Sequence, residues 1–129
     1  MILLDTHIVL WLAQVPDMLS DRAHAAIAQA RKSDGLGISD KSLWEIALLV
    51  SRGQVRVQTS LHDFLVKVER TFIVLPVNAL VAERSVQFST QYPKDPADRL
   101  IGATALIHAT ELVTADKAIQ QSGEVPCIW

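Results

Sequence analysis

The 129-residue chain is half hydrophobic and one fifth charged, which is typical of a single ordered domain with a real core and excludes a disordered chain. No apolar run approaches the roughly 20 residues of a membrane helix, no signal-peptide pattern is recognised, and a single cysteine, Cys127, excludes an internal disulfide. The net charge of −2 neither indicates nor excludes a nucleic-acid partner. We expect one cytoplasmic domain over residues 1–129, without membrane contact.

The first predicted element is a buried strand at the start of the chain. Met1–Leu4 is apolar without alternation, the pattern of a strand covered on both faces of a parallel sheet. Asp5 follows at the carboxyl end of this strand, the position at which open α/β sheets bind ligands. Because an isolated buried carboxylate is costly, Asp5 must be solvated, paired or bound to a metal ion. A short helix over 6–13, capped by Thr6, is expected next.

The rest of the chain alternates between helical and strand patterns. Capping residues and the 3–4 spacing of apolar residues predict helices at 21–32, 40–51, 60–70, 78–90 and 96–108. Short apolar runs predict strands at 36–39, 72–77, 111–114 and 125–129. A last short helix is predicted at 117–121. Such alternation indicates an α/β fold with three layers, a mostly parallel central sheet of four to five strands and helices on both faces.

Four acidic residues stand out by their positions. Asp5 ends the first strand, Asp116 follows the fourth, and Asp98 lies in the first turn of a helix. Glu45 is the only charge among the apolar residues 43–50, and a helix that is apolar on all sides is buried, so Glu45 should face a cleft or a partner. The four histidines lack the spacing of zinc ligands. Several carboxylates without a Cys/His cluster favour Mg²⁺ or Mn²⁺, which prefer oxygen ligands.

Each of these acids also has a purely structural interpretation. Asp95 and Asp98 flank Pro96 in a sequence that suits the start of a helix, and Asp116 would cap the last helix equally well. Glu45 would serve as a surface charge beside a partner. Asp95 is interpreted first as a cap and second as an outer ligand. Spacing alone leaves both interpretations open.

Four motifs in order give a more specific signal. Together they span nearly the whole chain, and they are Leu4–His7, Ser39–Ala47, Asp95–Ala105 and Leu112–Asp116. With these motifs the sequence resembles the PIN-domain nucleases, in particular the VapC-like toxins of bacterial toxin–antitoxin pairs. The resemblance implies a three-layer PIN-like domain. It also implies that the metal-binding and catalytic acids are Asp5, Glu45, Asp98 and Asp116, with the hydroxyls of Thr6 and Thr114 beside them and Asp95 in support.

The resemblance further implies an activity and partners. These are Mg²⁺- or Mn²⁺-dependent endoribonuclease activity on RNA, a homodimer, inhibition by a small cognate antitoxin, and no direct DNA binding without that antitoxin. Surplus apolar residues, such as Trp44, Leu48 and Leu49, agree with a dimer. One departure concerns a histidine that relatives often carry two positions before the residue matching Asp95. This chain has Pro93 there, so no loop histidine is expected to act.

The predicted mechanism is attack by a cation-bound water on the scissile phosphorus, with Thr114 directing a carboxylate or that water. His7 is close enough in sequence to reach the site, although a surface or core role is the commoner one for such a histidine. Cys127 is interpreted as a small buried hydrophobe. Phosphate contacts need positive charge, and the candidates near motifs or loops are Lys41, Arg52, Arg56 and Arg99, followed by Lys94 and Lys117.

Two alternatives from other classes remain at this point. A phospho-acceptor receiver domain has a similar length and the same alternation, but it needs paired acids after the first strand, and here Asp5 stands alone. A catalytically silent binding module would use all four acids as caps or solvated charges. Trp11 and Trp44 are candidates for base stacking, although their apolar neighbours favour packing in the core or against a second copy.

Overall fold

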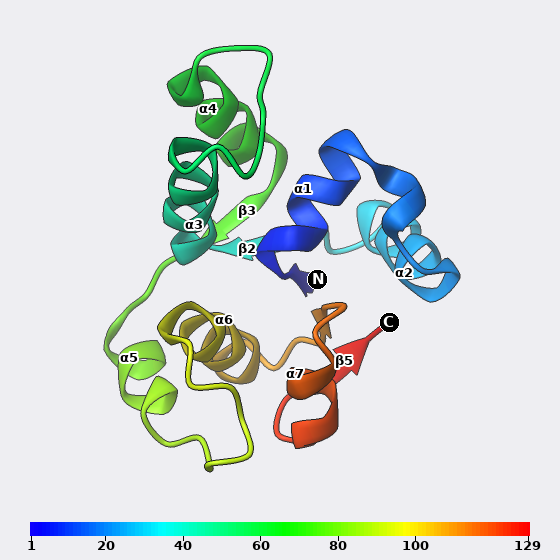
Figure 1. Ribbon diagram of the computed structural model, residues 1–129. Coiled ribbons are helices and arrows are strands. Elements are labelled where there is room, and N and C mark those ends of the chain that lie inside the picture. The colour runs from blue at the N-terminus through cyan, green and yellow to red at the C-terminus, as the bar shows by residue number, and fades with distance from the viewer.

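A five-stranded parallel sheet forms the centre of the computed structural model, which describes all of residues 1–129 (Figure 1). The strand order is β3-β2-β1-β4-β5, and every neighbouring pair is parallel. The strands are β1 Ile2–Leu4, β2 Leu36–Ser39, β3 Ile73–Leu75, β4 Leu112–Val113 and β5 Cys127–Ile128. This order excludes the receiver alternative, because receiver-like folds have the order 2-1-3-4-5.

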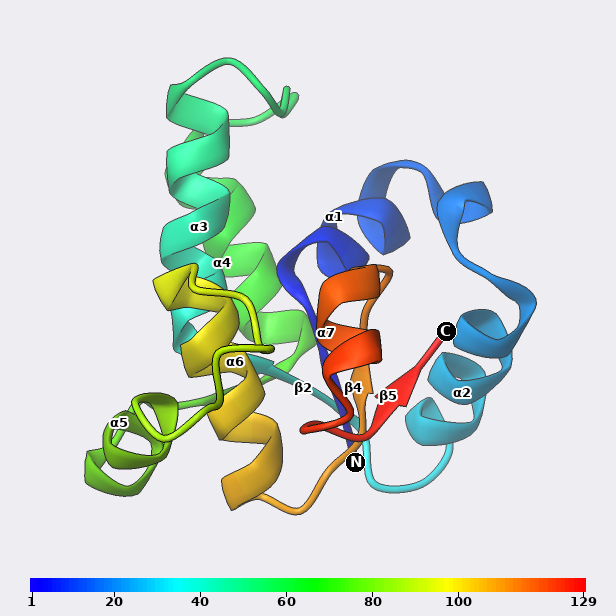
Figure 2. The ribbon, with the colours of Figure 1, turned by 60° about the horizontal axis from the view of Figure 1, so that its bottom comes forward.

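The helices form the two outer layers of the predicted three-layer fold, which is confirmed. They are α1 Thr6–Gln14, η1 Pro16–Met18, α2 Asp21–Arg31, α3 Asp40–Ser51, α4 Leu61–Thr71, α5 Ala79–Ser85, α6 Pro96–Ile107 and α7 Lys117–Ser122. In Figure 1, α1 to α4 lie above the sheet and α5 to α7 lie below it, and Figure 2 shows α7 beside β4 and β5. None of the helices has the length and apolar character needed to span a bilayer.

Successive strand residues contribute to two separate cores. Leu4 and Val113 pack in the core between the sheet and helices α1 to α4, whereas Leu3 and Leu112 pack in the core between the sheet and helices α5 to α7. All four side chains are fully buried. Because neighbouring residues of a strand point to opposite faces, an apolar run without alternation supplies both layers. Burial of each such side chain contributes about 1.5–3 kcal/mol, so these residues anchor β1 and β4 between the two layers.

Some predicted boundaries are wrong, and the causes are local. The helix predicted over 78–90 ends at Ser85, because Phe88 turns inward to stack on Tyr92 with ring centroids 3.9 Å apart. The carboxylate of Glu124 then accepts hydrogen bonds from the backbone N–H and hydroxyl of Ser89, at 2.9 and 2.8 Å. The strand predicted over 72–77 covers only 73–75, since the residue after it is Pro76, which cannot donate to the ladder.

Three further expectations are corrected. The first helix is capped by Asp5, whose carboxylate accepts from the Thr6 N–H, and not by Thr6 itself. Helix α3 is much less enclosed than its apolar sequence suggests. Only Ser42 and Ile46 are fully buried on it, and Trp44 is 53% exposed. Cys127 is half-buried rather than enclosed.

The contact between Tyr92 and Gly102 joins the loop before α6 to that helix. Tyr92 is 1% exposed, and its hydroxyl donates to the carbonyl of Asp98 at 2.6 Å. A Cβ at Gly102 would clash with that hydroxyl and would lie 2.8 Å from Cζ of the same ring. The glycine therefore leaves the space that the ring occupies, and the ring holds the first turn of α6.

We expect Gly102→Ala to lower the free energy of unfolding by about 1–3 kcal/mol, because the stacked ring has no room to move. Urea unfolding followed by circular dichroism measures this change. Adding Tyr92→Leu to the same variant should make the penalty of Gly102→Ala smaller, since the obstructing ring is gone. A stabilisation by Gly102→Ala of the size seen in open helices, about 1 kcal/mol, would contradict the expected clash with the Tyr92 ring.

Candidate active site

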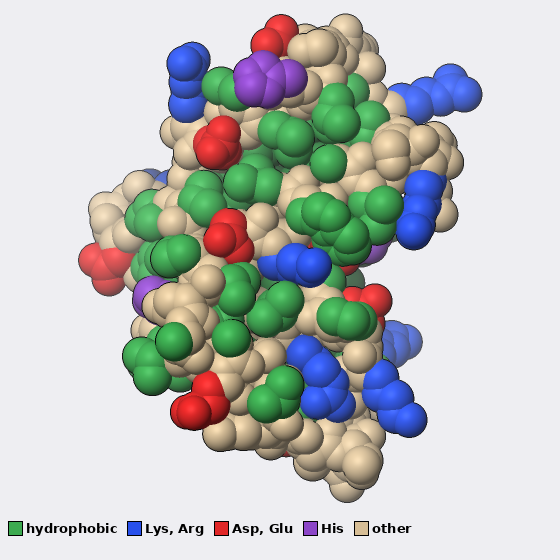
Figure 3. Space-filling model, turned by 90° about the vertical axis from the view of Figure 1, so that its left-hand side faces the viewer, with side chains coloured by type: hydrophobic (Ala, Val, Ile, Leu, Met, Phe, Trp, Pro, Cys, Tyr) green, Lys and Arg blue, Asp and Glu red, His purple; other side chains and the backbone are tan.

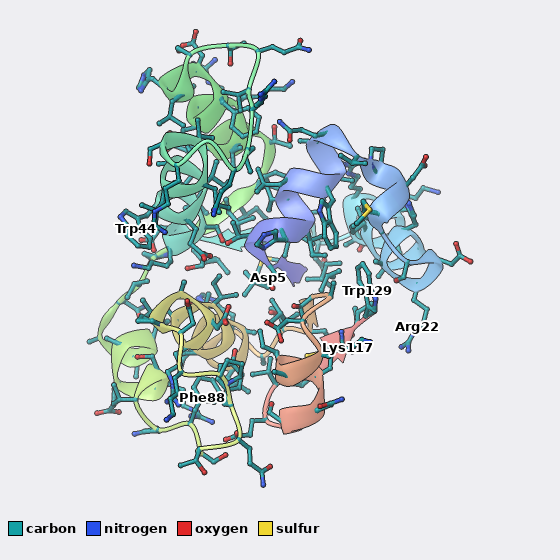
Figure 4. The ribbon with its side chains drawn as sticks, viewed as in Figure 1. Asp5, Arg22, Trp44, Phe88, Lys117 and Trp129 are labelled. Atoms are coloured by element: carbon teal, nitrogen blue, oxygen red, sulfur yellow. The ribbon has the colours of Figure 1, made fainter.

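The acidic residues predicted from the sequence line one cavity at the carboxyl ends of β1 and β4. The cavity has a volume of about 360 Å³ and is lined by Asp5, His7, Trp11, Glu45, Asp95, Asp98, Ala115 and Asp116. Figure 4 shows Asp5 between the helices of the upper layer and those of the lower layer. Four different parts of the chain thus deliver carboxylates to one place.

Asp5 is the most enclosed of these carboxylates, with 8% of its surface exposed. One of its oxygens accepts from the Thr6 N–H at 2.8 Å, and the other accepts from the Thr114 hydroxyl at 2.7 Å. Burial raises the pKa of Asp5, and the two hydrogen bonds act against that rise by stabilising the charged form. The Thr114 hydroxyl also accepts from the Asp116 N–H at 3.1 Å, so one side chain links both strand ends.

Glu45 reaches the cavity from α3. Its Oε1 accepts a hydrogen bond of 2.5 Å from the hydroxyl of Thr6, the first residue of α1. The Thr6 hydroxyl also lies 3.0 Å from that of Ser42, which is fully buried one turn before Glu45. Burial raises the pKa of Glu45, the Thr6 hydrogen bond lowers it, and the charge of Asp5 raises it. Thr6 therefore orients Glu45 through its side chain and Asp5 through its backbone.

Asp98 carries the clearest sign of crowded negative charge. Burial, followed by the charges of Asp5, Asp95, Asp116 and Glu45, raises its pKa to about 7. Its own carboxylate accepts no hydrogen bond from the protein, although its backbone carbonyl is held by Tyr92. A carboxyl group in this position is stabilised either by a proton or by a cation.

Asp95 and Asp116 act as helix caps, as their structural interpretation predicted. Oδ1 of Asp116 accepts from the backbone N–H groups of Ala118 and Ile119 at 2.8 and 3.1 Å. Oδ1 of Asp95 accepts from those of Ala97 and Asp98 at 2.8 and 3.2 Å. In both residues the second oxygen accepts no hydrogen bond and remains available. Capping and ligand binding are therefore compatible in one carboxylate.

The donor set fits a hard divalent cation. No lysine or arginine pairs with these acids, because the one salt bridge of the structure joins the Met1 amine to Asp34 at 3.4 Å. In the conformation described, no three His, Cys, Asp or Glu side chains are close enough together to coordinate one ion. Hydrogen bonds hold one or both oxygens of Asp5, Glu45, Asp95 and Asp116 in this conformation. A bound cation would need the free oxygens, notably those of Asp98, Asp116 and Glu45, to turn toward a common point.

An aromatic wall lies on one side of the cavity. His7 is exposed at the rim, and its ring centroid is 6.2 Å from that of Trp11. Trp11 in turn lies 6.0 Å from Trp129. No sequence pattern indicated a role for Trp129 or Tyr92. The role of Ser42 was not predicted either, although its position three residues before Glu45 places both residues on the same side of the helix.

None of the predicted substrate-binding cations lines the acidic cavity. Lys41 and Arg52 line a separate groove beside it, and Arg56 is exposed at a third depression. The Nε of Arg99 donates to the carbonyl of Pro93 at 3.0 Å, so this residue braces the loop before α6. The additional candidates Lys94 and Lys117 are both exposed, and neither forms a salt bridge with the acids. The positive charge therefore surrounds the acids without neutralising them.

The comparison with known sequences agrees with this architecture. Residues 2–124 match the family model of the PIN domain. The chain is also 32% identical over 119 residues to Ribonuclease VapC22 of Mycobacterium tuberculosis, an alignment that covers 92% of this chain and 89% of that protein. The chain therefore belongs to the PIN-domain family, and the resemblance found in its motifs is confirmed.

Solved structures of toxin–antitoxin complexes share the fold. VapBC2 from Rickettsia felis, bound to a promoter DNA fragment, contains a chain that superposes with a TM-score of 0.75 at 17% identity, covering 98% of this chain and 97% of that one. VapBC-1 from nontypeable Haemophilus influenzae gives a TM-score of 0.68 at 18% identity, covering 98% and 96%. At these identities the likeness is one of fold.

Asp98→Asn should stabilise the metal-free protein at pH 8. The raised pKa means that the folded protein binds more protons than the unfolded chain between about pH 4 and pH 7, so this carboxyl costs stability as the pH rises through that range. We expect a rise in Tm on the order of a few degrees at pH 8 and almost none at pH 4. Asp63→Asn, which changes an exposed first-turn acid of α4, is the control and should not raise Tm. An equal rise in Tm at both pH values would contradict the prediction that the charged form of Asp98 lowers the stability.

Thr114→Val should weaken divalent-ion binding about 10- to 100-fold, because Asp5 loses the hydroxyl that orients it while the side-chain volume is kept. Titration of the purified protein with Mn²⁺ in a calorimeter measures the change. Thr104→Val is the matched control, since Thr104 is equally buried but its hydroxyl donates to the carbonyl of Leu100 within α6. The same loss of affinity in both variants would mean that Thr114 acts only through general stability.

Proposed function

We propose that this chain is a metal-dependent endoribonuclease and the toxin of a toxin–antitoxin pair. The observation that carries the proposal is the convergence of five carboxylates in one cavity without any pairing cation. Its PIN-domain membership and its identity to a protein named as a ribonuclease give further support. A binding module with silent acids would not need the charge crowding that raises the pKa of Asp98 to about 7.

The acids Asp5, Glu45, Asp98 and Asp116 would hold Mg²⁺ or Mn²⁺, with Asp95 as a supporting ligand. When bound, such an ion polarises a phosphodiester and lowers the pKa of a water molecule that attacks it. The remaining work belongs to the protein's own hydrogen bonds. The Thr114 hydroxyl orients Asp5 through a hydrogen bond of 2.7 Å, and the Thr6 hydroxyl orients Glu45 through one of 2.5 Å; each bond partly offsets the rise in pKa that burial causes. Thr114 is thus a positioning residue in this proposal.

Hydrolysis here needs no side-chain nucleophile. The attacking oxygen comes from water, one P–O bond forms, and the bond to the leaving oxygen breaks. The remaining candidate nucleophile, Cys127, is unsuited, because burial raises the pKa of its thiol to about 11 and its Sγ donates to the carbonyl of Val125 at 3.1 Å. His7, exposed at the rim of the cavity, is placed where it can contact the substrate strand.

Two protein partners belong to the proposal. A cognate antitoxin is proposed because the structural neighbours are chains of toxin–antitoxin complexes. A homodimer is proposed because apolar side chains on and after α5 remain exposed, with Leu80 at 60% and Val86 at 78%. Direct DNA binding by this chain alone is not part of the proposal.

Purified, antitoxin-free protein should cleave single-stranded RNA in Mn²⁺ or Mg²⁺, and EDTA should abolish the cleavage. Asp5→Asn and Asp116→Asn should each lower the rate at least about a hundredfold, while asparagine preserves the helix caps and hence the fold. Labelled RNA resolved on a gel measures the rate. Asp21→Asn, an exposed first-turn acid of α2, is the control and should cleave normally. Cleavage that survives EDTA and both site variants would refute the proposal.

A further inference from the structure

A second groove lies beside the acidic cavity, between α3 and the start of α6. It has a volume of about 400 Å³, within the range of roughly 300–1,000 Å³ that holds small organic groups. Its walls include Lys41, Trp44, Leu48 and Arg52 from α3 and Pro96 from α6. Glu45 and Asp95 line both this groove and the acidic cavity, so the two are immediate neighbours.

The α3 side of the groove is a stripe of two apolar side chains between two cationic ones. Lys41, Trp44, Leu48 and Arg52 follow one another at intervals of three and four residues, which places them along one face of the helix. At about 1.5 Å per residue, the backbone positions of the two cationic residues are roughly 16 Å apart along the helix axis. The apolar side chains lie between them. The stripe thus offers flat apolar surface with a positive charge at each end.

Trp44 is unusually accessible for a tryptophan on an apolar helix, at 53% exposure. Nζ of Lys41 lies over one face of its ring, 3.8 Å from the centroid, in a cation–π contact, so a base would stack on the opposite face. Neither Lys41 nor Arg52 forms a salt bridge, so both charges are available to an anion. Figure 4 shows Trp44 projecting from α3 on the outer side of the molecule.

We propose that this groove binds an unpaired nucleotide of the RNA strand next to the phosphate being cleaved. Its base stacks on Trp44, and its flanking phosphates contact Lys41 and Arg52. This inference rests on the nuclease function proposed above and adds a substrate subsite to it. Base stacking on aromatic side chains beside cations is the usual way in which proteins hold single strands, and it tolerates different sequences.

Charge favours RNA over a second copy of the chain as the occupant. Lys and Arg side chains are interspersed with hydrophobic ones on the face seen in Figure 3. In a twofold contact centred on the groove, Lys41 of one copy would approach Arg52 of the other, and these like charges would repel each other. A polyanion instead gains from both charges. Because Glu45 and Asp95 border the inner end of the groove, the phosphates are best placed toward the outer cations.

The test measures binding of a short, fluorescently labelled oligouridylate to the cleavage-deficient Asp116→Asn protein. Adding Trp44→Ala should weaken binding about tenfold, whereas Trp44→Phe should retain most of the affinity. A series of oligouridylates, each with one abasic site at a different position, should then be tested. The Asp116→Asn protein that retains Trp44 should bind one member of the series more weakly than the others. At that position Trp44→Ala should cause no further loss, because base and ring are then both missing.

Arg52→Ala should reduce the slope of log affinity against log salt by about 0.7, the change expected for one lost contact to a single strand. Arg22→Ala is the matched control, since Arg22 projects from α2 away from the groove (Figure 4) and should leave the slope unchanged. Equal changes in both variants would show that only overall charge matters and would overturn the inference.

Light scattering tests whether a second copy of the chain, rather than RNA, occupies the groove. If Trp44→Ala converts a dimer to a monomer while its affinity for the oligouridylate stays that of the parent protein, a second copy covers the groove and the inference is wrong. Unchanged mass together with unchanged affinity also overturns it. The proposed function fails separately, when the protein with an intact Asp116 cleaves no RNA in Mn²⁺. RNA cleavage by that protein with no effect of Trp44→Ala on binding refutes only the subsite.

Discussion

The site depends on one hydrogen bond between residues that are far apart in the chain. The Thr114 hydroxyl donates to the Asp5 carboxylate, and the two residues are 109 positions apart. The bond exists because β1 and β4 are parallel neighbours with Leu4 opposite Val113, so both strands end at the same level. The Asp5 N–H donates to the carbonyl of Val113 at 3.0 Å and extends that register by one residue. The two apolar cores below and above the sheet therefore determine where the carboxylates meet.

The same side chains build the helices and prepare the site. Asp5, Asp95 and Asp116 each cap a helix with one oxygen, which stabilises α1, α6 and α7 in the absence of any ligand. The N-terminal ends of these helices also carry partial positive charge, which helps to keep clustered carboxylates ionised. Asp98 and Glu45 do not cap, and burial and neighbouring charge raise the pKa of both. Crowded acids cost stability, and that cost is the physical reason why a cation would bind.

Local sequence patterns predicted most of the fold, because each signal was contained in a few adjacent residues. The convergence of the acids was expected only from the resemblance to the PIN-domain nucleases, since spacing alone left it open. Met1–Leu4 indicated a strand buried on both faces, and Pro96 after Asp95 indicated the start of a helix. What escaped prediction depends on contacts between distant segments. The inward turn of Phe88 onto Tyr92 ended α5 early, and no local pattern reports that stacking. The exposure of Trp44 likewise depends on the absence of a neighbouring element, which a helical window cannot reveal.

In the proposed function, the separation of charge around α3 would allow an acidic cavity to act on a polyanion. A strand of RNA is repelled by Asp5, Asp98 and Asp116 unless a cation neutralises them, so the protein needs attraction at some distance from the site of cleavage. If Lys41 or Arg52 lined the acidic cavity, it would pair with the carboxylates and compete with the metal ion. Both instead lie beyond the wall that Glu45 shares with the cavity. The charge proposed to bind the metal ion and the charge proposed to bind the substrate thus lie close together without pairing.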